Sequence, residues 1–539
     1  MKFKLLAAGA LLCLAAAPAP AIEAPAESPP PAPAAKRTVS GIHVWTDRSV
    51  DCFSRETLLA SLVKPGMSDE EKAVAFWRFV HSRIYHFPRP DDNDPMRVLN
   101  VYGYALCGTI QHVLVWLGQG AMGNDAAGGA GLNSRKVQTE EERRIMGAGW
   151  LLDSFVRLDA AKPPTGMGHS WCQFRYGGRE HYLDAHAGLY VYTADGKSIA
   201  SIAEISGDPT LVSDPVRTSV PFMPCDGGRP EFFYFVAGGG LGKGAEKTAH
   251  SMELRVRPGE ALVFHFDKLP GGHFKRSSSW VKEWAPEFYQ EGPHHRCSGG
   301  LEKSWRHYGN GEILFRPDLG KAGFRESLAE ESNLAAQAED GKPGLHPKTA
   351  GTPAAAAFDF QTPYIMVAGE VSAEFDLPKG AAAKVLLVAP GAREGKPQTL
   401  LAVEGEGGRK KAAGNMDMCA LGYPYTARVR VELSGPAGAE APALVGLQVR
   451  IITQINFHTL PRPLPGKNRI DVECAAGDPK SAGLDIEWAW NERGGAERSD
   501  RRAVENAKFA YGLELGEVDT KPADNPKYMR WLKLEAPDK

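Results

Sequence analysis

Neither sign of charge dominates this chain of 539 residues, in which 63 lysines and arginines balance 65 aspartates and glutamates. The resulting formal net charge of -2 offers no basic excess for the phosphates of a nucleic acid. Beyond the N-terminal leader, no stretch approaches about 18 continuous apolar residues. We therefore expect neither a nucleic-acid partner nor a membrane span, and the length allows several domains.

Cysteine is scarce, and its eight positions include no Cys-x-x-Cys pair of the kind used in redox sites. Residues 1–21 have the pattern of a secretory signal peptide, with Lys2 and Lys4 ahead of an apolar segment and Ala19-Pro20-Ala21 at a cleavage site. Cleavage there removes Cys13 and leaves an odd number of cysteines, so at least one is unpaired in a monomer. We expect an exported protein, periplasmic or extracellular, in which either catalysis or simple burial explains such a thiol.

Composition divides the rest of the chain into segments of different character. Helical periodicity follows a Pro/Ala-rich stretch, and short alternating strands with Pro/Gly turns dominate the remainder. The expected segments are a spacer at 22–39, a first globular domain at 40–225, a β-rich domain at 226–326, a linker or long loop at 327–357 and a second β-sandwich-type region at 358–539. The predicted fold class is α+β, with β-sandwich-type domains after the first domain.

Two helices are predicted early in the first domain. Ser68-Asp69-Glu70-Glu71 has the spacing of a capping box, and the apolar residues behind it recur every three to four positions. A second helix begins at or just before Cys107 and ends near Gly118. The Gly-rich, charged stretch at 119–167 holds a further predicted helix near Glu140–Phe155. An irregular stretch this long is either a functional loop or lid or a disordered segment.

The next segment has the pattern of a β-hairpin. Strand-like residues at His169–Phe174 and His181–Leu183 flank Tyr176-Gly177-Gly178-Arg179, where the glycines permit a tight turn. Strand alternation places Cys172 on the face opposite His169. A core or disulfide cysteine is therefore predicted at Cys172, rather than a second nucleophile.

Three short stretches carry one catalytic constellation in chain order: Ala-Leu-Cys107-Gly-Thr, Gly-His169-Ser-Trp and His-Tyr-Leu-Asp184. A cysteine is a strong nucleophile only as a thiolate, a nearby histidine can take its proton, and an acid can fix the orientation of that histidine. A helix N-terminus lowers the pKa of the Cys107 thiol and supplies N–H groups for an oxyanion. Tyr182 and His186 share the strand face of Asp184, and His186 is either an accessory residue or a polar residue at a strand end.

This arrangement resembles the transglutaminase-like superfamily, the papain-related group that includes exported bacterial cysteine peptidases, peptide N-glycanases and transglutaminases. The resemblance covers about residues 50–225 and rests on Cys107-Gly108, Gly168-His169-Ser170-Trp171 and Tyr182-Leu183-Asp184. It implies a papain-like catalytic domain in which the cysteine is the nucleophile, the histidine the base and then the acid, and the aspartate the residue that orients the histidine.

The resemblance also implies an aromatic or amide oxyanion donor ahead of the cysteine, for which Tyr102 and Tyr104 are the candidates. Such chemistry needs no metal and no cofactor. Exported bacterial relatives carry appended β regions like those expected here. The long stretch between Cys107 and His169 departs from the family pattern and implies an unusual substrate cleft.

Three other patterns are interpreted as loops. Gly238–Gly244 lacks the Ser or Thr that follows the lysine of a phosphate-binding loop. His294-His295-Arg296-Cys297 has no second ligand pair at zinc spacing. Asp91-Asp92-Asn93-Asp94 lacks the glycine and the terminal glutamate of an EF-hand loop.

Two functional hypotheses follow. The first is an exported, cysteine-dependent acyl-transfer enzyme acting on a protein or peptide substrate or on cell-envelope material, hydrolytic rather than cross-linking because hydrolysis needs no second substrate site. The alternative is a catalytically inactive domain that serves as a cell-surface or polysaccharide-binding module. Trp280, Trp284 and Trp305 are candidate sugar-stacking residues for that role, and core packing is the competing interpretation of all three.

Overall fold

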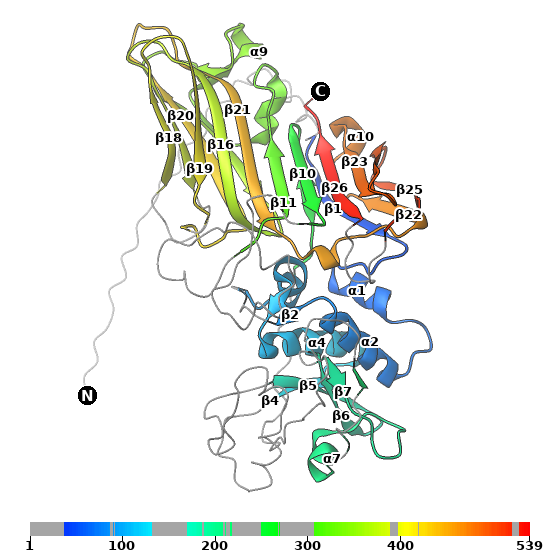
Figure 1. The fold of residues 1–539 in the computed structure, drawn as a ribbon. Coiled ribbons are helices and arrows are strands. Elements are labelled where there is room, and N and C mark those ends of the chain that lie inside the picture. Colours follow the sequence, from blue (N-terminus) through cyan, green and yellow to red (C-terminus); the bar gives the residue numbers. More distant parts are fainter. Residues whose placement is uncertain are drawn as a thin grey trace, which may run out of the picture. The chain divides into compact units, whose positions relative to one another are not determined.

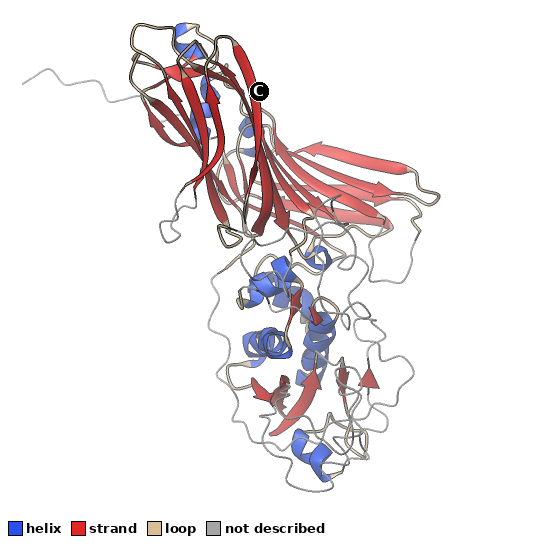
Figure 2. Cartoon of the chain, turned by 60° about the vertical axis from the view of Figure 1, so that its left-hand side comes forward, coloured by secondary structure: helices blue, strands red, loops and turns tan. Residues whose placement is uncertain are grey.

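The computed structural model describes residues 37–86, 90, 92–131, 170–185, 188–208, 211, 216–217, 250–267, 269, 307–388, 397–418, 420–519 and 528–538. Helices and strands are mixed, and strands predominate in several sheets (Figure 2). The expectation of a mixed fold rich in β structure is confirmed at this level. Within the described ranges, no helix is both long enough and apolar enough to cross a bilayer.

Side-chain caps start four helices of the described first segment, namely α1 (Arg55–Leu62), α2 (Asp69–His81), α3 (Pro95–Arg97) and α7 (Ile202–Gly207). α2 follows Ser68, whose hydroxyl accepts from the Glu71 N–H while the Glu71 carboxylate accepts from the Ser68 N–H. The capping box predicted there is confirmed, and a second one at Ser54 opens α1. The described first segment also contains the π-helix η1 (Val98–Tyr102) and α4 (Cys107–Met122).

A small antiparallel sheet carries the predicted hairpin. Its strands, in spatial order, are β4 (Ala127–Gly131), β5 (Ser170–Tyr176), β6 (Arg179–Asp184), β7 (Leu189–Tyr190) and β8 (Val216–Arg217). Tyr176 pairs with Arg179 across a two-residue turn, in which Gly177 and Gly178 have φ angles of 58° and 76°. Both angles lie in the left-handed region that glycine adopts without strain, so the predicted hairpin and its turn are confirmed. A two-stranded parallel sheet of β2 (Tyr85–His86) and β3 (Tyr104–Ala105) lies just ahead of α4 in the chain.

α4 begins at Cys107, as predicted, but it continues past Gly118 to Met122. A Cβ added at Gly118 would lie 2.6 Å from the Phe174 ring and 2.8 Å from the Ala127 Cβ. The glycine therefore lets the helix approach β4 and β5 closely, and it is not the end of the helix. A glycine that follows an apolar stripe can mark either the end of a helix or a close contact within it. The sequence does not distinguish these two cases.

Long antiparallel strands form the β region (Figure 1). A ten-stranded sheet among the described residues consists of β13 (Leu334–Ala336), β14 (Leu345–Pro347), β21 (Ala443–Gln454), β11 (Gly311–Phe315), β10 (Glu260–His265), β26 (Met529–Ala536), β23 (Asp485–Asn491) and β24 (Glu497–Ala503), with β16 (Ile365–Asp376) pairing with β21 and with β19 (Arg409–Met416). A five-stranded sheet consists of β12 (Leu328–Ser332), β15 (Ala354–Gln361), β20 (Thr426–Ser434), β17 (Ala382–Val388) and β18 (Gln398–Glu404). Apolar residues alternate with polar ones along β16, β20 and β21, and the inward side chains of Phe375, Val431 and Val449 are buried.

The two large sheets pack face to face. The Phe315 ring of β11 lies 5.4 Å from Phe358 and 5.7 Å from Phe360 of β15, measured between ring centroids. These aromatic pairs sit in a continuous buried layer, which is the arrangement expected of a β-sandwich. Short helical turns connect strands in this region: η4 (Ala322–Ser327), α9 (Gln337–Asp340), η5 (Phe457–Thr459) and α10 (Pro479–Ala482).

The first described strand belongs to a four-stranded sheet in which two strands come from the end of the chain. β1 (Val39–Thr46) lies between β22 (Gly466–Glu473) and β9 (Leu254–Val256), and β25 (Lys508–Leu515) completes this four-stranded sheet. The ten-stranded sheet likewise combines strands from the segments expected at 226–326 and 358–539. The described residues, all of which lie at or after Arg37, belong to one compact unit.

Residues 327–357 differ from the expected linker or long loop. They contain β12, β13, α9, β14 and the start of β15. β12 is an exposed edge strand with polar side chains, and the buried residues of β15 begin with four alanines. Neither feature gives a strong apolar alternation, so the pattern on which the strand predictions relied is weak in this segment.

Candidate active site

Cys107 is the first residue of α4 and its side chain is half-buried. Leu106, with an extended backbone at φ -76° and ψ 160°, precedes it and has no polar side chain with which to cap the helix. The first N–H groups of an α-helix have no intrahelical acceptor, and the helix dipole there favours negative charge. In α4 the N–H groups from Thr109 onward are already engaged, since those of Thr109 and Ile110 donate to the Leu106 carbonyl at 2.9 Å. The position therefore suits a thiolate and, beside it, an oxyanion.

Asp184 ends β6 and is buried, with 1% of its surface exposed. Its carboxylate accepts a hydrogen bond of 3.1 Å from the Tyr182 hydroxyl. Burial raises the pKa of Tyr182 well above its usual value, and the Asp184 charge adds to that shift, so the phenol stays a donor. The acid is thus held in one orientation from its own strand.

Two aromatic side chains of α2 hold the end of β6 by its backbone. The Trp77 indole N–H donates to the Asp184 carbonyl at 2.9 Å, and the His81 Nδ1 lies 2.7 Å from the Ala185 carbonyl. The two rings stack with an interplanar angle of 9°. These two contacts were not predicted from the sequence. Trp77 and His81 stand four apart in the predicted helix, which is the spacing of neighbours on one helix face.

Replacing Trp77 by phenylalanine is expected to leave the Asp184 carbonyl without its donor. We expect a loss of about 1–3 kcal/mol in stability. If Asp184 orients the histidine as predicted, its displacement should also lower activity by about tenfold or more. Melting temperature and turnover measured on the same preparation test this. Trp488→Phe is the matched control, because it removes an indole bond of 2.9 Å to Tyr511 in β25 and should lower stability alone. Equal activity losses in both variants would contradict a positioning role for Trp77.

His169, the predicted base, lies outside the described residues, as do Gly168 and His186. β5 begins at the residue that follows His169, and Cys172 pairs with Leu183 in the register of the hairpin. The predicted helix near Glu140–Phe155 also lies outside the described residues. So do the other residues singled out in the sequence, namely Asp91, Gly238–Gly244, His294-His295-Arg296-Cys297, Trp280, Trp284 and Trp305.

Asp94, by contrast, is described, and it caps α3. Its side chain accepts from the Arg97 N–H at 3.1 Å, and Pro95 occupies the first helical position. The carboxylate of Asp92 accepts from the Asp94 N–H and pairs with the Arg97 guanidinium. A turn before Pro95 was expected from the sequence, and the structure adds that Asp94 caps α3.

The candidate oxyanion donors Tyr102 and Tyr104 are buried, and their hydroxyls meet residues of the β region. The Tyr102 hydroxyl lies 3.4 Å from that of Tyr425, and the Tyr104 hydroxyl lies 3.3 Å from His307 Nδ1 and accepts from Gln454 at 3.3 Å. These contacts are with the β region rather than with the first turn of α4. The backbone N–H groups of that turn are the better oxyanion donors among the described residues.

A buried amide ties η1, which precedes Cys107, to the end of β21. The Asn456 side chain donates to the carbonyls of Arg83 and Leu99 at 2.9 and 2.7 Å, and its backbone N–H donates to the Asn100 carbonyl at 2.8 Å. Gly103 follows η1 with φ +65°, and a Cβ there would lie 2.7 Å from the Asn456 amide carbon. The backbone leading to Cys107 is therefore fixed by a side chain more than 300 positions away in the sequence.

Cys172 is buried in the small sheet, where it pairs with Gly129 and Leu183. Burial raises the pKa of its thiol well above the ordinary value, against a smaller opposite effect of a backbone hydrogen bond at Gly128. It is a free core cysteine. Burial also raises the pKa of Cys52 to about 12.

The buried thiols of Cys52 and Cys172 are expected to resist the alkylation that is expected at Cys107. At pH 8, iodoacetamide should leave Cys52 and Cys172 unmodified in the native protein, because both hold their protons when folded. Since the folded state keeps the Cys52 proton longer than the unfolded state, stability falls as the pH rises from 9 towards 12. Peptide mass spectrometry before and after denaturation measures the labelling, and rapid native labelling of Cys172 would contradict this assignment.

No protein-family model matches the chain, and no curated protein matches it. Among solved structures, TmCBM61 in complex with β-1,4-galactotriose is 13% identical, with 28% of this chain and 71% of that chain covered and a TM-score of 0.13. The Spr0440 glycoside hydrolase domain, Endo-D from Streptococcus pneumoniae R6, is 9% identical over 52% of this chain and 44% of that one, with a TM-score of 0.15.

A β-glucuronidase from Parabacteroides merdae is 12% identical, with 51% of this chain and 34% of that chain covered and a TM-score of 0.14. The chain spans about a third or less of the length of three other β-glucuronidase structures that it matches, namely 31%, 22% and 24%. TM-scores this low carry no argument about fold or function.

Proposed function

We propose that the protein is an exported, cysteine-dependent acyl-transfer enzyme of the transglutaminase-like type, acting on peptide or carboxamide bonds. The observation that carries the proposal is the position of Cys107 as the half-buried first residue of α4. A buried aspartate held at the end of β6 supports it, because the motif around Asp184 assigns that residue the orienting role. The catalytic domain expected at 40–225, and export directed by residues 1–21, are parts of the same proposal.

The reaction proceeds in two halves. His169 takes the proton of the Cys107 thiol, and the thiolate attacks the carbonyl carbon, so that a C–S bond forms and the carbonyl oxygen becomes an oxyanion. The backbone N–H groups of the first turn of α4 stabilise that oxyanion. When the C–N bond breaks, His169 returns its proton to the leaving amine, and Asp184 stabilises the imidazolium in between.

The second half regenerates the thiol. A water molecule, deprotonated by His169, attacks the acyl carbon of the thioester, and the C–S bond to the acyl group breaks. The carboxylic acid leaves, and the Cys107 sulfur takes back a proton from His169. An amine in place of water would give cross-linking with the same residues. We favour hydrolysis, because it requires no second substrate site.

An electrophile that modifies activated thiols tests this function. Fluorescent iodoacetamide at substoichiometric concentration and pH 7 should label Cys107 in the wild-type protein, and peptide mapping should place the label there. Cys107→Ala should lose the label, and His169→Ala should label at least about tenfold more slowly because the thiolate fraction falls. Equal labelling of the wild type and His169→Ala would overturn the activated-thiolate mechanism.

A further inference from the structure

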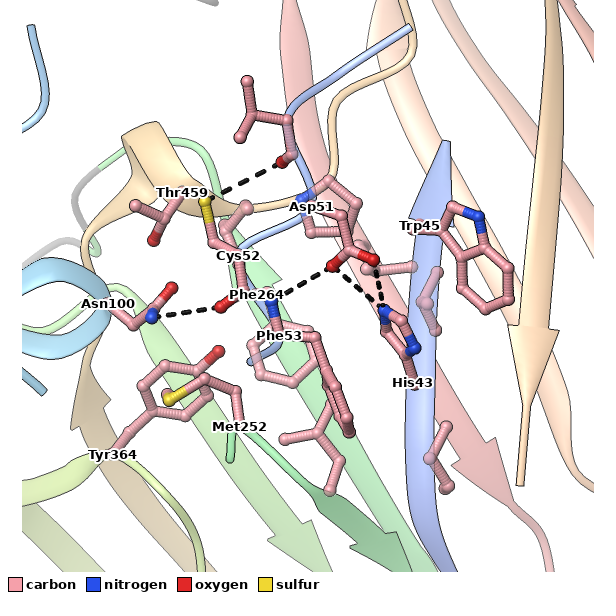
Figure 3. Close-up of a pocket in the computed structure, with 17 residues that line it drawn as sticks. His43, Trp45, Asp51, Cys52, Phe53, Asn100, Met252, Phe264, Tyr364 and Thr459 are labelled. Atoms are coloured by element: carbon pink, nitrogen blue, oxygen red, sulfur yellow. Dashed lines mark hydrogen bonds and ion pairs between the residues drawn. The ribbon is translucent and has the colours of Figure 1, made fainter. Parts of the chain in front are cut away.

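An open groove of about 660 Å³ lies where β1 meets α1. Trp45 and His43 of β1 form one wall, and Ala60 and Lys64, at and just beyond the end of α1, line the groove as well. The volume falls within the range of about 300–1,000 Å³ that small-molecule sites occupy. A narrower, mostly apolar pocket shares Trp45, His43 and Asp51 with the groove (Figure 3).

The aromatic wall of the groove is rigid. The His43 ring stacks between Trp45 and Phe53, with ring centroids 4.4 Å and 3.9 Å apart and interplanar angles of 28° and 18°. Asp51 fixes the central ring, because His43 Nε2 lies 2.9 Å from one carboxylate oxygen and 3.0 Å from the other. The same carboxylate accepts from the Phe53 N–H at 3.0 Å, as Figure 3 shows. The half-buried indole of Trp45 is thus held in place before any ligand arrives.

The charges along the groove nearly cancel. Its charged lining consists of Asp47, Arg48, Asp51, Lys64 and Glu473. Two of these groups are committed to the backbone, since Arg48 donates to the Pro465 carbonyl at 2.7 Å and Asp47 accepts from the Arg469 N–H at 2.9 Å. A strongly charged ligand would meet no matching excess of charge, whereas hydroxyl groups can pair with donors and acceptors of both kinds.

We propose that this groove binds a neutral oligosaccharide, with one sugar ring stacked on Trp45. A pyranose ring presents an apolar C–H face to an indole, and its hydroxyls reach polar groups at the rim. Because the Trp45 indole is already ordered, it loses little conformational freedom when a sugar binds. The site uses no residue of the proposed catalytic set, so it stands whether or not Cys107 is active.

Isothermal titration calorimetry of the full chain tests the proposal. The probes are cellotetraose, maltotetraose, chitotetraose and, as a charged comparison, tetragalacturonate. The variants are Trp45→Ala, which removes the platform, and Ala60→Arg, which fills the groove from an exposed position without touching the core. Trp531→Ala is the matched control, because Trp531 is also half-buried on a strand but does not line the groove. Thermal melting verifies that each variant is folded.

We expect at least one neutral tetrasaccharide to bind with a Kd at or below about 1 mM. Trp45→Ala and Ala60→Arg should each weaken it by about tenfold or more, and Trp531→Ala should leave it unchanged. Three results would overturn the proposal: no binding of any neutral probe, binding that neither groove variant weakens, or a preference for tetragalacturonate. Absence of thiol labelling at Cys107 would not change the calorimetric result. The labelling experiment and the titration therefore test the two proposals independently.

Discussion

A Cys107→Ala variant is expected to lose acyl transfer to below about one thousandth of the wild-type rate, because the covalent intermediate needs the sulfur. The structural cost should be small, since the side chain is half-buried at the first position of α4 and alanine is a good helix residue. Release of amine from a peptide-amide library, followed by mass spectrometry, measures the rate. Melting curves of the variant and the wild type should agree within a few degrees.

Cys172→Ala is the matched control for that variant. It removes a thiol of the same size that is buried, protonated and part of the small sheet. We expect activity to be retained and stability to fall by about 1 kcal/mol. If Cys172→Ala abolished turnover in a folded protein while Cys107→Ala did not, the assignment of the nucleophile would be wrong.

An Asn456→Ala variant is expected to lower both stability and activity. The side chain has 0% exposure, and its loss leaves the carbonyls of Arg83 and Leu99 without the donors described above. Loss of the donor to a carbonyl costs about 1–3 kcal/mol, so the loss of these two hydrogen bonds is expected to cost about 2–6 kcal/mol. Because η1 leads through β3 to Cys107, activity should fall as well, even at temperatures where the variant is folded.

Asn506→Ala provides the comparison. Asn506 is exposed and accepts one hydrogen bond, from the Lys508 N–H at 3.0 Å. We expect its replacement to change stability by less than about 0.5 kcal/mol and activity not at all. Denaturant unfolding followed by tryptophan fluorescence compares the two variants. An Asn456→Ala protein as stable and as active as Asn506→Ala would show that the buried amide does not fix the approach to Cys107.

Local patterns predicted much of the fold near the candidate site. The capping box at Ser68, the helix start at Cys107 and the glycine turn at Gly177-Gly178 each depend on a few adjacent residues, and the structure has all of them. Such features follow from hydrogen-bond geometry and backbone conformation within one or two turns of chain. A core or disulfide cysteine was predicted at Cys172, and this residue is buried and free.

Features that depend on distant residues were not predictable in this way. In the pairing of β1 with β22, Trp45 lies opposite Asp471. The residue pattern of neither strand indicates which strand it pairs with. The Asn456 side chain looks like an ordinary loop residue in the sequence, yet it bonds to two carbonyls near η1. The groove at Trp45 was not predicted for the same reason, because its lining combines residues of β1 and α1 with Glu473 of β22.

The pH dependence of Cys107 alkylation tests the central claim most directly. The rate constant for iodoacetamide at Cys107, measured by peptide mass spectrometry from pH 5 to pH 10, reports the pKa of that thiol. The account predicts an apparent pKa well below the ordinary cysteine value of about 8.5 in the wild type, and a rise towards that value in His169→Ala. A wild-type Cys107 that titrates at or above about 8.5, with no change in His169→Ala, would contradict it.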